Sequence, residues 1–386
     1  MKRALRLLAL VAAPVLASPA LADDPCCATG DLGLVIERAT GTLLVVDRSD
    51  RAAVGKVEGL GDLSHASLTY GPDERHAYVF GRDGGLSKVD MLTRKVVART
   101  VQAGNSIGGA ISDDGKLVAV SNYEPGGVKV FDADTLALVA DVPAAGKTIG
   151  LVDVPGRRFA WTVWDTGEVF LGDFSGATPV ITPLGNAGKN PFDAVLTEDA
   201  HTYLIGLFGE KGVTAFDLWD ADPKPVKFLQ DYGKTEDDLP VYKMPHLQGW
   251  AFAEGQYVLP AVGAHELLWV DRETLTEVAR TPVHGQAVFI IAQPASPYVW
   301  VNFATPRNDV VQVIDSRTHE VVKTLTPGKA VLHMEFAPRG AEVWISSRDD
   351  NKVVIYDTRS FEVLGEVAAE SPSGIFFTAR AHRTGL

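Results

Sequence analysis

ASLTYGPDERHAYVFGRDGGLSKVDMLTRKVVARTV, residues 66–101, contains four short runs of apolar or alternating residues separated by turn-forming sequences. The turns are GPDE at 71–74, RDGG at 82–85 and TR at 93–94. Runs of this length that are rich in Val, Tyr, Phe and Thr and bounded by Gly, Pro and Asp are typical of β-strands. The stretch therefore predicts one small sheet of four antiparallel strands.

The same pattern recurs along the chain, and each copy contains a β-type run that ends in an aspartate. The successive spacings between these aspartates are 43, 42, 41, 44, 54, 44 and 42 residues. Self-similarity at a period of about 40–45 residues, with four strands in each unit, is typical of the blades of a β-propeller. The eight aspartates predict eight blades, and they are Asp47, Asp90, Asp132, Asp173, Asp217, Asp271, Asp315 and Asp357.

The two ends of the repeat indicate how the ring closes. Only two strand-like runs, LGLVIER and GTLLVVD, lead up to the first aspartate, so the first unit lacks an innermost strand. An extra run, SGIFFTARA at 373–381, follows the last unit and would supply that strand. We expect an all-β, eight-bladed propeller over residues 32–386 that is closed by N- and C-terminal strands in one blade. The 54-residue unit carries the one large insertion, QDYGKTEDDLPVY at 230–242.

The first 22 residues have the features of a secretory signal peptide. Three basic residues, a short apolar run and the small-residue end ALA at 20–22 follow one another. We expect residues 1–22 to be a signal peptide, residues 23–31 to be a flexible tail that contains Cys26 and Cys27, and the protein to act in the periplasm. The adjacent cysteines lack the spacing of a zinc or haem-attachment motif. They are either a simple part of the tail, a vicinal disulfide or an intermolecular link.

Charge and missing motifs exclude several classes of function. The net charge is −13 for the whole chain and −16 without the first 22 residues, which argues against nucleic acid and anionic membranes as partners. No later segment is long and apolar enough to span a membrane. The chain also lacks a Rossmann glycine motif, a Walker loop, a G-x-S-x-G elbow and H-E-x-x-H.

Four of the nine histidines fall at equivalent places in the repeat. His65, His246 and His284 each come just before an innermost strand, and His333 lies at the start of another. In a propeller these places surround one mouth of the central channel. The alternative for each of them is a hydrogen-bonded structural role in the channel wall. The other five histidines fall in turns, at strand edges or in the tail, and we interpret them as surface residues.

The loops that follow the second strands supply further polar residues on the same face. These are Arg82 in GRDGG, Tyr123 in SNYEPGG, Arg307 in NFATPRND and Arg348 in SSRDD. A guanidinium group presents a planar fork of donors that matches a carboxylate. The alternative for Arg82 and Arg348 is an ion pair with the neighbouring aspartate. Histidines with carboxylate-binding arginines in a wide channel suit a haem-like macrocycle, and a three-histidine zinc or iron site is the other option.

The run GDLSHASLTYGPDERHAYVFGRDGG, together with KMPHLQGW and TPVHGQAVF, resembles the d1-haem domain of cytochrome cd1 nitrite reductases and the stand-alone haem d1 biosynthesis proteins related to it. The resemblance covers nearly the whole chain after the leader. It implies that His65 is the axial ligand of d1-haem iron and that His246 and His284 are distal-pocket residues with catalytic roles. It also implies that Arg82 lies near the macrocycle, and we add Tyr123, Arg307, His333 and Arg348 as cofactor-binding candidates.

The chain departs from the nitrite reductases because it has no cytochrome c domain with a CxxCH motif. The resemblance therefore implies binding of d1 haem or a late precursor during its biosynthesis. Three roles stay open: an oxidoreductase that modifies a ring substituent, a carrier that delivers d1 haem to nitrite reductase or to other assembly proteins, and a propeller scaffold. A blade edge or the insertion at 230–242 could form a homodimer interface.

Overall fold

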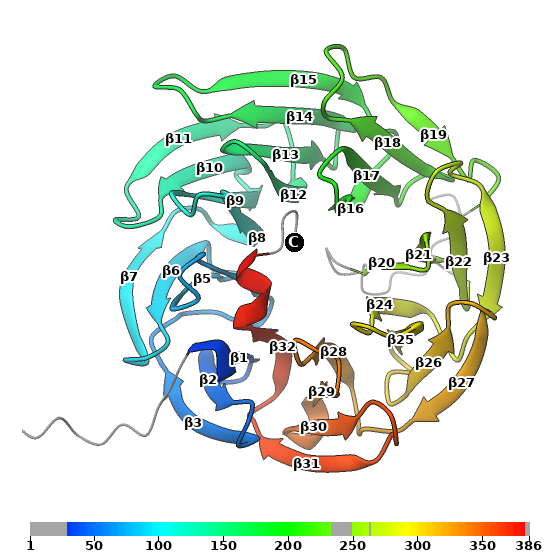
Figure 1. Cartoon of the computed structure of the whole chain (residues 1–386). Coiled ribbons are helices and arrows are strands. Elements are labelled where there is room, and N and C mark those ends of the chain that lie inside the picture. The colour runs from blue at the N-terminus through cyan, green and yellow to red at the C-terminus, as the bar shows by residue number, and fades with distance from the viewer. Residues whose placement is uncertain (1–28, 233–248, 262–263, 383–386) are drawn as a thin grey trace, which may run out of the picture.

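The computed structural model describes residues 29–232, 249–261 and 264–382, and in them the chain folds into eight four-stranded antiparallel sheets. The sheets are arranged in a ring as the blades of a propeller (Figure 1). This confirms the expected all-β, eight-bladed fold. Several of the sequence predictions lie outside the described residues, namely the expected signal peptide at 1–22, Cys26, Cys27, His246 and most of the insertion at 230–242.

Each blade runs outward from an innermost first strand to an exposed fourth strand. Blade 1 consists of β32 (Pro372–Phe377), β1 (Leu32–Glu37), β2 (Thr42–Asp47) and β3 (Ala52–Val57). Blades 2 and 3 are β4 (Ser67–Tyr70), β5 (His76–Phe80), β6 (Gly85–Asp90), β7 (Lys95–Val101), then β8 (Asn105–Ile111), β9 (Leu117–Glu124), β10 (Gly126–Asp132) and β11 (Leu138–Pro143).

Blades 4 to 6 follow in the same order. They are β12 (Thr148–Val154), β13 (Arg158–Val163), β14 (Glu168–Asp173), β15 (Val180–Asn186), then β16 (Pro191–Leu196), β17 (Thr202–Leu207), β18 (Val213–Asp217), β19 (Val226–Phe228), then β20 (Ala251–Ala253), β21 (Gln256–Pro260), β22 (Glu266–Asp271) and β23 (Glu277–Pro282).

Blades 7 and 8 complete the ring, and within the described residues three short 3-10 helices accompany the strands. The strands are β24 (Ala287–Ala292), β25 (Tyr298–Phe303), β26 (Val311–Asp315), β27 (Glu320–Leu325), then β28 (Val331–Phe336), β29 (Glu342–Ser347), β30 (Lys352–Asp357) and β31 (Val363–Ala368). The helices are η1 (Thr29–Asp31), η3 (Arg348–Asp350) and η4 (Thr378–His382). Among the described residues no helix has the length and apolar character needed to cross a membrane.

Both ends of the chain close the ring in blade 1, as the sequence predicts. The C-terminal strand β32 pairs antiparallel with β1, and Gly33 lies opposite Phe377. The absence of a side chain at Gly33 makes room for the Phe377 ring, since a Cβ there would lie 2.5 Å from it. The Thr378 hydroxyl also donates to the Thr29 carbonyl at 3.0 Å. Closure therefore joins residues from the two extremes of the chain.

Each of the repeated aspartates lies at the end of a third strand, at the turn that leads to the fourth strand. In every blade the carboxylate accepts a backbone N–H from two or three residues further on, which satisfies amides that the turn leaves without a ladder partner. For example, Asp132 accepts from Asp134 and Thr135 at 3.2 and 2.8 Å. The same contacts form at Asp47, Asp90, Asp173, Asp217, Asp271, Asp315 and Asp357. A turn requirement thus explains the spacing in the sequence.

The apolar core lies between adjacent blades. Four tryptophans on second and third strands are fully buried, namely Trp161, Trp269, Trp300 and Trp344. The side chains of neighbouring blades share clusters: one cluster contains Leu34 of β1 and Tyr70 and Val79 of blade 2. Each blade is therefore stabilised mainly by its two neighbours, which makes the ring a single packed body.

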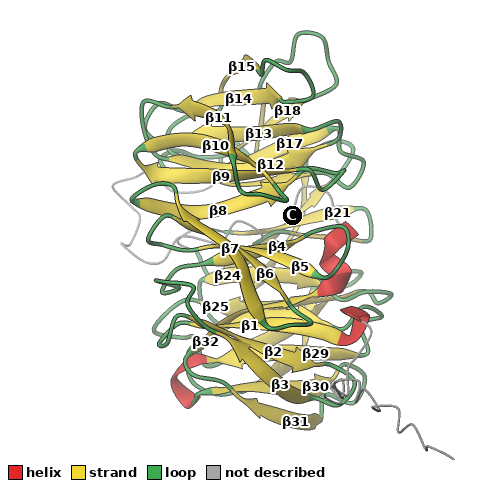
Figure 2. Ribbon diagram, turned by 90° about the vertical axis from the view of Figure 1, so that its left-hand side faces the viewer, coloured by secondary structure: helices red, strands yellow, loops and turns green. Residues whose placement is uncertain are grey.

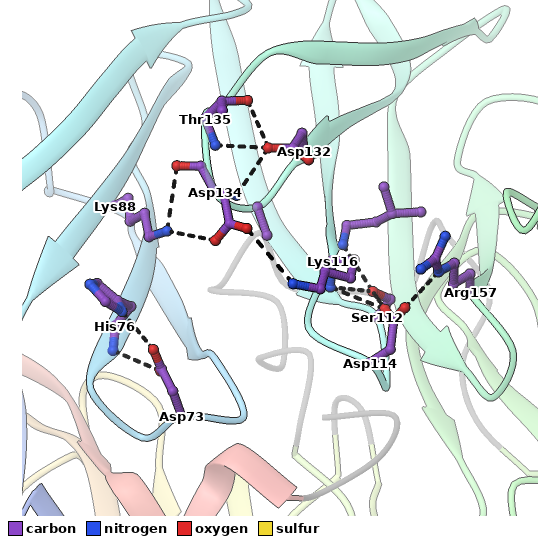
Figure 3. A network of polar contacts seen from close by, with 12 residues as sticks. Asp73, His76, Lys88, Ser112, Asp114, Lys116, Asp132, Asp134, Thr135 and Arg157 are labelled. Atoms are coloured by element: carbon purple, nitrogen blue, oxygen red, sulfur yellow. Dashed lines mark hydrogen bonds and ion pairs between the residues drawn. The ribbon is translucent and has the colours of Figure 1, made fainter.

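The propeller has two faces with different loops. We call the face with the loops that enter first strands, and the loops from second to third strands, the entry face. The opposite face carries η1 and η4, which lie toward the right of Figure 2. Ion pairs join neighbouring blades on that opposite face, for example Lys88 with Asp134 and Arg157 with Asp114 (Figure 3).

Candidate functional site

His65 lies half-buried in the entry-face loop between β3 and β4. Two leucines of this loop, Leu60 and Leu63, are fully buried in the cluster shared by blades 1 and 2. The loop is thus anchored by apolar burial on either side of a polar stretch. This anchoring explains how a segment without ladder hydrogen bonds can present a histidine in a fixed place.

Polar contacts fix the residues just before His65. The Ser64 N–H donates to Asp62 Oδ1 at 2.8 Å, and the Arg38 guanidinium donates to the Ser64 carbonyl. The backbone N–H of Arg82 donates to the Asp62 carbonyl at 2.9 Å. Hydrogen bonds from Ser64 lower the pKa of Asp62, because they stabilise its charged form. The His65 loop is therefore tied to the second-to-third-strand loops of blades 1 and 2.

The charges of Arg82 and Arg348 act on Arg38, and we call these three residues the arginine cluster. Each comes directly after, or two residues after, the second strand of its blade, and the blades are 1, 2 and 8, which are neighbours in the ring. Burial lowers the pKa of Arg38, and the charges of Arg348 and Arg82 lower it further. An anion at this cluster would relieve the repulsion between like charges.

The aspartates beside these arginines divide into two cases. Arg348 Nε donates to Asp349 at 2.7 Å, so it forms the neighbour pair that was the alternative in the sequence. Asp83 instead pairs with Arg99 at 2.6 Å, and Arg99 also donates to the Leu60 carbonyl at 3.1 Å. Within the described residues, the side chain of Arg82 makes no hydrogen bond or ion pair. Arg82 is thus the member of the cluster with the most donors left for a ligand.

His284 and Arg307 are brought together on the entry face of blade 7. Arg307 Nη1 donates to the His284 carbonyl at 2.6 Å, and the His284 N–H donates to Gln312 at 2.8 Å. The imidazole contacts the Phe303 ring edge-to-face at 5.5 Å. The backbone of His284 is therefore held on two sides while its half-buried ring lies against an aromatic residue.

His333 occupies a different environment from His65 and His284. It is buried in β28, and its ring lies between the rings of Phe289 and Phe376. The centroid of the imidazole is 4.5 Å from that of Phe289 and 5.4 Å from that of Phe376. Its Nδ1 accepts the backbone N–H of Ile375 at 3.2 Å across the junction of blades 8 and 1. This nitrogen is the acceptor of the pair, so it carries no proton in this arrangement. His333 thus links the closing strand to its neighbour within the inner wall.

The candidate Tyr123 and two of the other histidines, His76 and His319, lie in three different environments. Tyr123 lies half-buried at the end of β9, and burial raises the pKa of its phenol. His76 lies on the opposite face, where it pairs with Asp73 at 2.6 Å (Figure 3). His319 is also far from the entry face in the repeat, but it packs on Trp269 at 4.7 Å and is only half exposed.

The structure also reveals residues that the sequence reading missed. Arg38 is one, and its position directly after a second strand is the signal that could have identified it. An aromatic group of Trp164, Phe192 and Phe208 is another: it lies at the entry-face ends of blades 4 and 5, with ring centroids 5.4–6.4 Å apart. Trp164 and Phe208 are half exposed, so this group offers an apolar surface on the same entry face.

These donors fit a planar, carboxylate-bearing macrocycle better than a compact metal ion. Within residues 29–232, 249–261 and 264–382, no group of three His, Cys, Asp or Glu residues could hold a metal ion. A haem-type iron already has four ring nitrogens and needs only one or two protein ligands, which single histidines can supply. Guanidinium groups like those of the arginine cluster bind carboxylates through charge-assisted, often bidentate, hydrogen bonds.

Comparisons with known proteins agree with this fit. The family described as "Cytochrome D1 heme domain" matches residues 27–381. The chain is 51% identical to Protein NirF of Stutzerimonas stutzeri over 95% of this chain and 96% of the relative. It is 50% identical to Protein NirF of Pseudomonas aeruginosa over 94% and 95%. A solved structure of dihydro-heme d1 dehydrogenase NirN in complex with DHE has a TM-score of 0.80 at 23% identity, over 92% of this chain and 77% of that one.

Proposed function

The chain belongs to the cytochrome D1 heme domain family, and from that premise we propose that it serves haem d1 biosynthesis by binding d1 haem or a late precursor at the entry-face mouth of its channel. The similarity to Protein NirF over nearly the full length supports the pathway. The observation that carries the binding site is the fixed His65 loop beside the arginine cluster. The iron of such a ligand would accept a nitrogen donor from the protein, and His65 would supply it.

His65 is the axial ligand in this proposal. Its loop is held by buried leucines and by hydrogen bonds at both sides of Ser64, so little ordering remains to be done when the ligand arrives. Preorganisation of this kind raises affinity because the entropy of ordering has been lost during folding. Arg82 and Arg348, with Tyr123, Arg307 and His333 around the mouth and the inner wall, hold and enclose the ring substituents.

His284 takes a different role in the proposal, as a group that binds or moves a proton at a ring substituent. Its fixed backbone and half-buried ring support this role, because they hold the imidazole in one place on the entry face. The same role is assigned to His246, which lies outside the described residues. If these histidines serve binding alone, the protein acts as a carrier for the macrocycle.

We extend the proposal to the location and partners of the protein. The leader-like residues 1–22 support the periplasm as its location. In its carrier role, the protein delivers the ligand to nitrite reductase or to another d1-haem assembly protein. Association of two copies is the further partner interaction that the proposal includes.

The experiment is a titration of the purified protein with d1 haem, followed in the visible region, for the wild type and for His65→Ala. His76→Ala is the matched control, because His76 begins β5 of blade 2, the blade that the His65 loop enters, but lies on the opposite face. We expect a saturable shift in the wild type and in His76→Ala that is altered in His65→Ala. An identical shift in all three proteins would remove the ligand role of His65, and no shift in any would overturn the proposed function.

A further inference from the structure

Arg38 connects the closure of the ring to the loop that carries His65. Its backbone N–H donates to the Ser371 carbonyl at 3.2 Å, just before the closing strand β32. The preceding residue, Glu37, is fully buried and accepts from Thr42 at 2.7 Å and from the Glu370 N–H at 2.8 Å. These contacts fix the main chain at Arg38 independently of the Arg38 side chain.

The Arg38 side chain then acts on the peptide bond that precedes His65. The guanidinium donates to the Ser64 carbonyl, and Asp62 accepts the Ser64 N–H at 2.8 Å. Charged side chains thus hold both polar groups of the residue before the histidine. Hydrogen bonds with one charged partner are about twice as strong as neutral ones, so this clamp restricts the rotation that would redirect His65.

The electrostatic setting indicates that this arginine has more than a packing role. Arg38 is half-buried next to Arg82 and Arg348, and both charges disfavour its own. A neutral donor could satisfy the Ser64 carbonyl without this repulsion between like charges. A cationic clamp becomes favourable when an anionic ligand group is bound among the three guanidinium groups, since it then stabilises the loop and the ligand together.

We propose that Arg38 is the positioning residue of the site: it holds the His65 loop in its binding geometry and couples this geometry to an anionic substituent bound at the arginine cluster. This inference rests on the proposed function for the identity of the ligand. The positioning of the loop is a property of the protein itself, because every contact that defines it lies within the chain. The two parts can therefore be measured separately.

The test compares Arg38→Ala and Arg38→Lys with the control Arg51→Ala. Arg51 belongs to the same blade but pairs with Glu342 at 2.5 Å in the turn between third and fourth strands, away from the entry face. The first readout is amide hydrogen exchange of residues 60–66 without ligand. We expect exchange about 10-fold faster in Arg38→Ala, an intermediate effect in Arg38→Lys and no change in Arg51→Ala.

The second readout is the visible and electron paramagnetic resonance spectrum of the ferric d1-haem complex. We expect Arg38→Ala to weaken binding about 10-fold and to broaden or alter the axial-ligand signature, while Arg51→Ala keeps the wild-type spectrum. Unchanged exchange and an unchanged signature in Arg38→Ala would overturn the inference. If the wild type itself binds no d1 haem, the proposed function fails, and the exchange data alone still decide whether Arg38 positions the loop. Should Arg38→Ala fail to fold, Arg38→Lys carries the same comparison.

Discussion

The pairing of Gly33 with Phe377 offers a quantitative test of how the ring is closed. These residues lie opposite each other in β1 and β32, and Phe377 is buried and contacts Trp344 edge-to-face at 5.5 Å. Phe377→Ala would leave a cavity at the closure and should lower the free energy of unfolding by about 3–5 kcal/mol. This is a large share of the roughly 5–15 kcal/mol that stabilises most domains.

Gly33→Ala should destabilise the protein for the opposite reason. Its new Cβ would meet the Phe377 ring at 2.5 Å, and such overpacking costs about 1–3 kcal/mol. When Phe377 is already Ala, the ring that causes the clash is gone. The double variant should then be about as stable as Phe377→Ala alone, which gives a coupling of about 1–3 kcal/mol between residues at the two ends of the chain.

The assay is equilibrium unfolding in urea for the wild type, both single variants and the double variant. Gly365→Ala is the control, because a Cβ at Gly365 meets no atom within 4 Å and its effect should add to that of Phe377→Ala. Strict additivity of Gly33→Ala and Phe377→Ala would refute the reasoning, since it would mean that β1 and β32 do not pack as the closing pair.

Two further predictions concern the turns. The Arg317 guanidinium and a turn amide hold the pKa of Asp315 at about 2, against 3.8 in its ordinary state, so this carboxylate stabilises the fold above pH 4 and the contribution is lost as the pH falls toward 2. Asp315→Asn should lower the free energy of unfolding at pH 7 and make it vary less between pH 4 and pH 2. Urea unfolding at a series of pH values measures this, and an unchanged dependence of the free energy of unfolding on pH would contradict the prediction. Gly84 has φ +77° and a Cβ there would lie 1.9 Å from the Ala103 carbonyl, whereas Gly59 has φ +81° and open space around it. Gly84→Ala should therefore lower the melting temperature clearly more than Gly59→Ala, and equal effects would rule out the steric part of the argument.

The architecture could be predicted from the sequence because its signals are local and repeated. Each of the eight aspartates satisfies turn amides two or three residues away, so spacing alone marks the blades. The extra strand-like run after Asp357 likewise indicated closure, and β32 pairs with β1 as expected. The first signal depends on hydrogen bonds within one hairpin. The second depends on the pairing of the extra C-terminal run with the first unit, which lacks an innermost strand.

The site could be predicted only in outline, because its contacts cross between blades. The motif around His65 and the arginine-bearing loops predicted a site on the entry face, but the contact from Arg38 to Ser64 joins residues 26 positions apart and has no local signal in the sequence. The environment of His333 also depends on the closing strand, whose Ile375 amide binds its Nδ1. The repeat indicated its blade position but not this partner.

The most direct test of the account is rescue of a cavity at His65. His65→Gly removes the proposed ligand and leaves space for free imidazole, and the visible and electron paramagnetic resonance spectra of the ferric d1-haem complex report the axial ligand. We predict that His65→Gly loses the wild-type signature and that added imidazole restores it, as expected if an imidazole nitrogen at this position binds the iron. A wild-type signature in His65→Gly without imidazole would contradict the central claim.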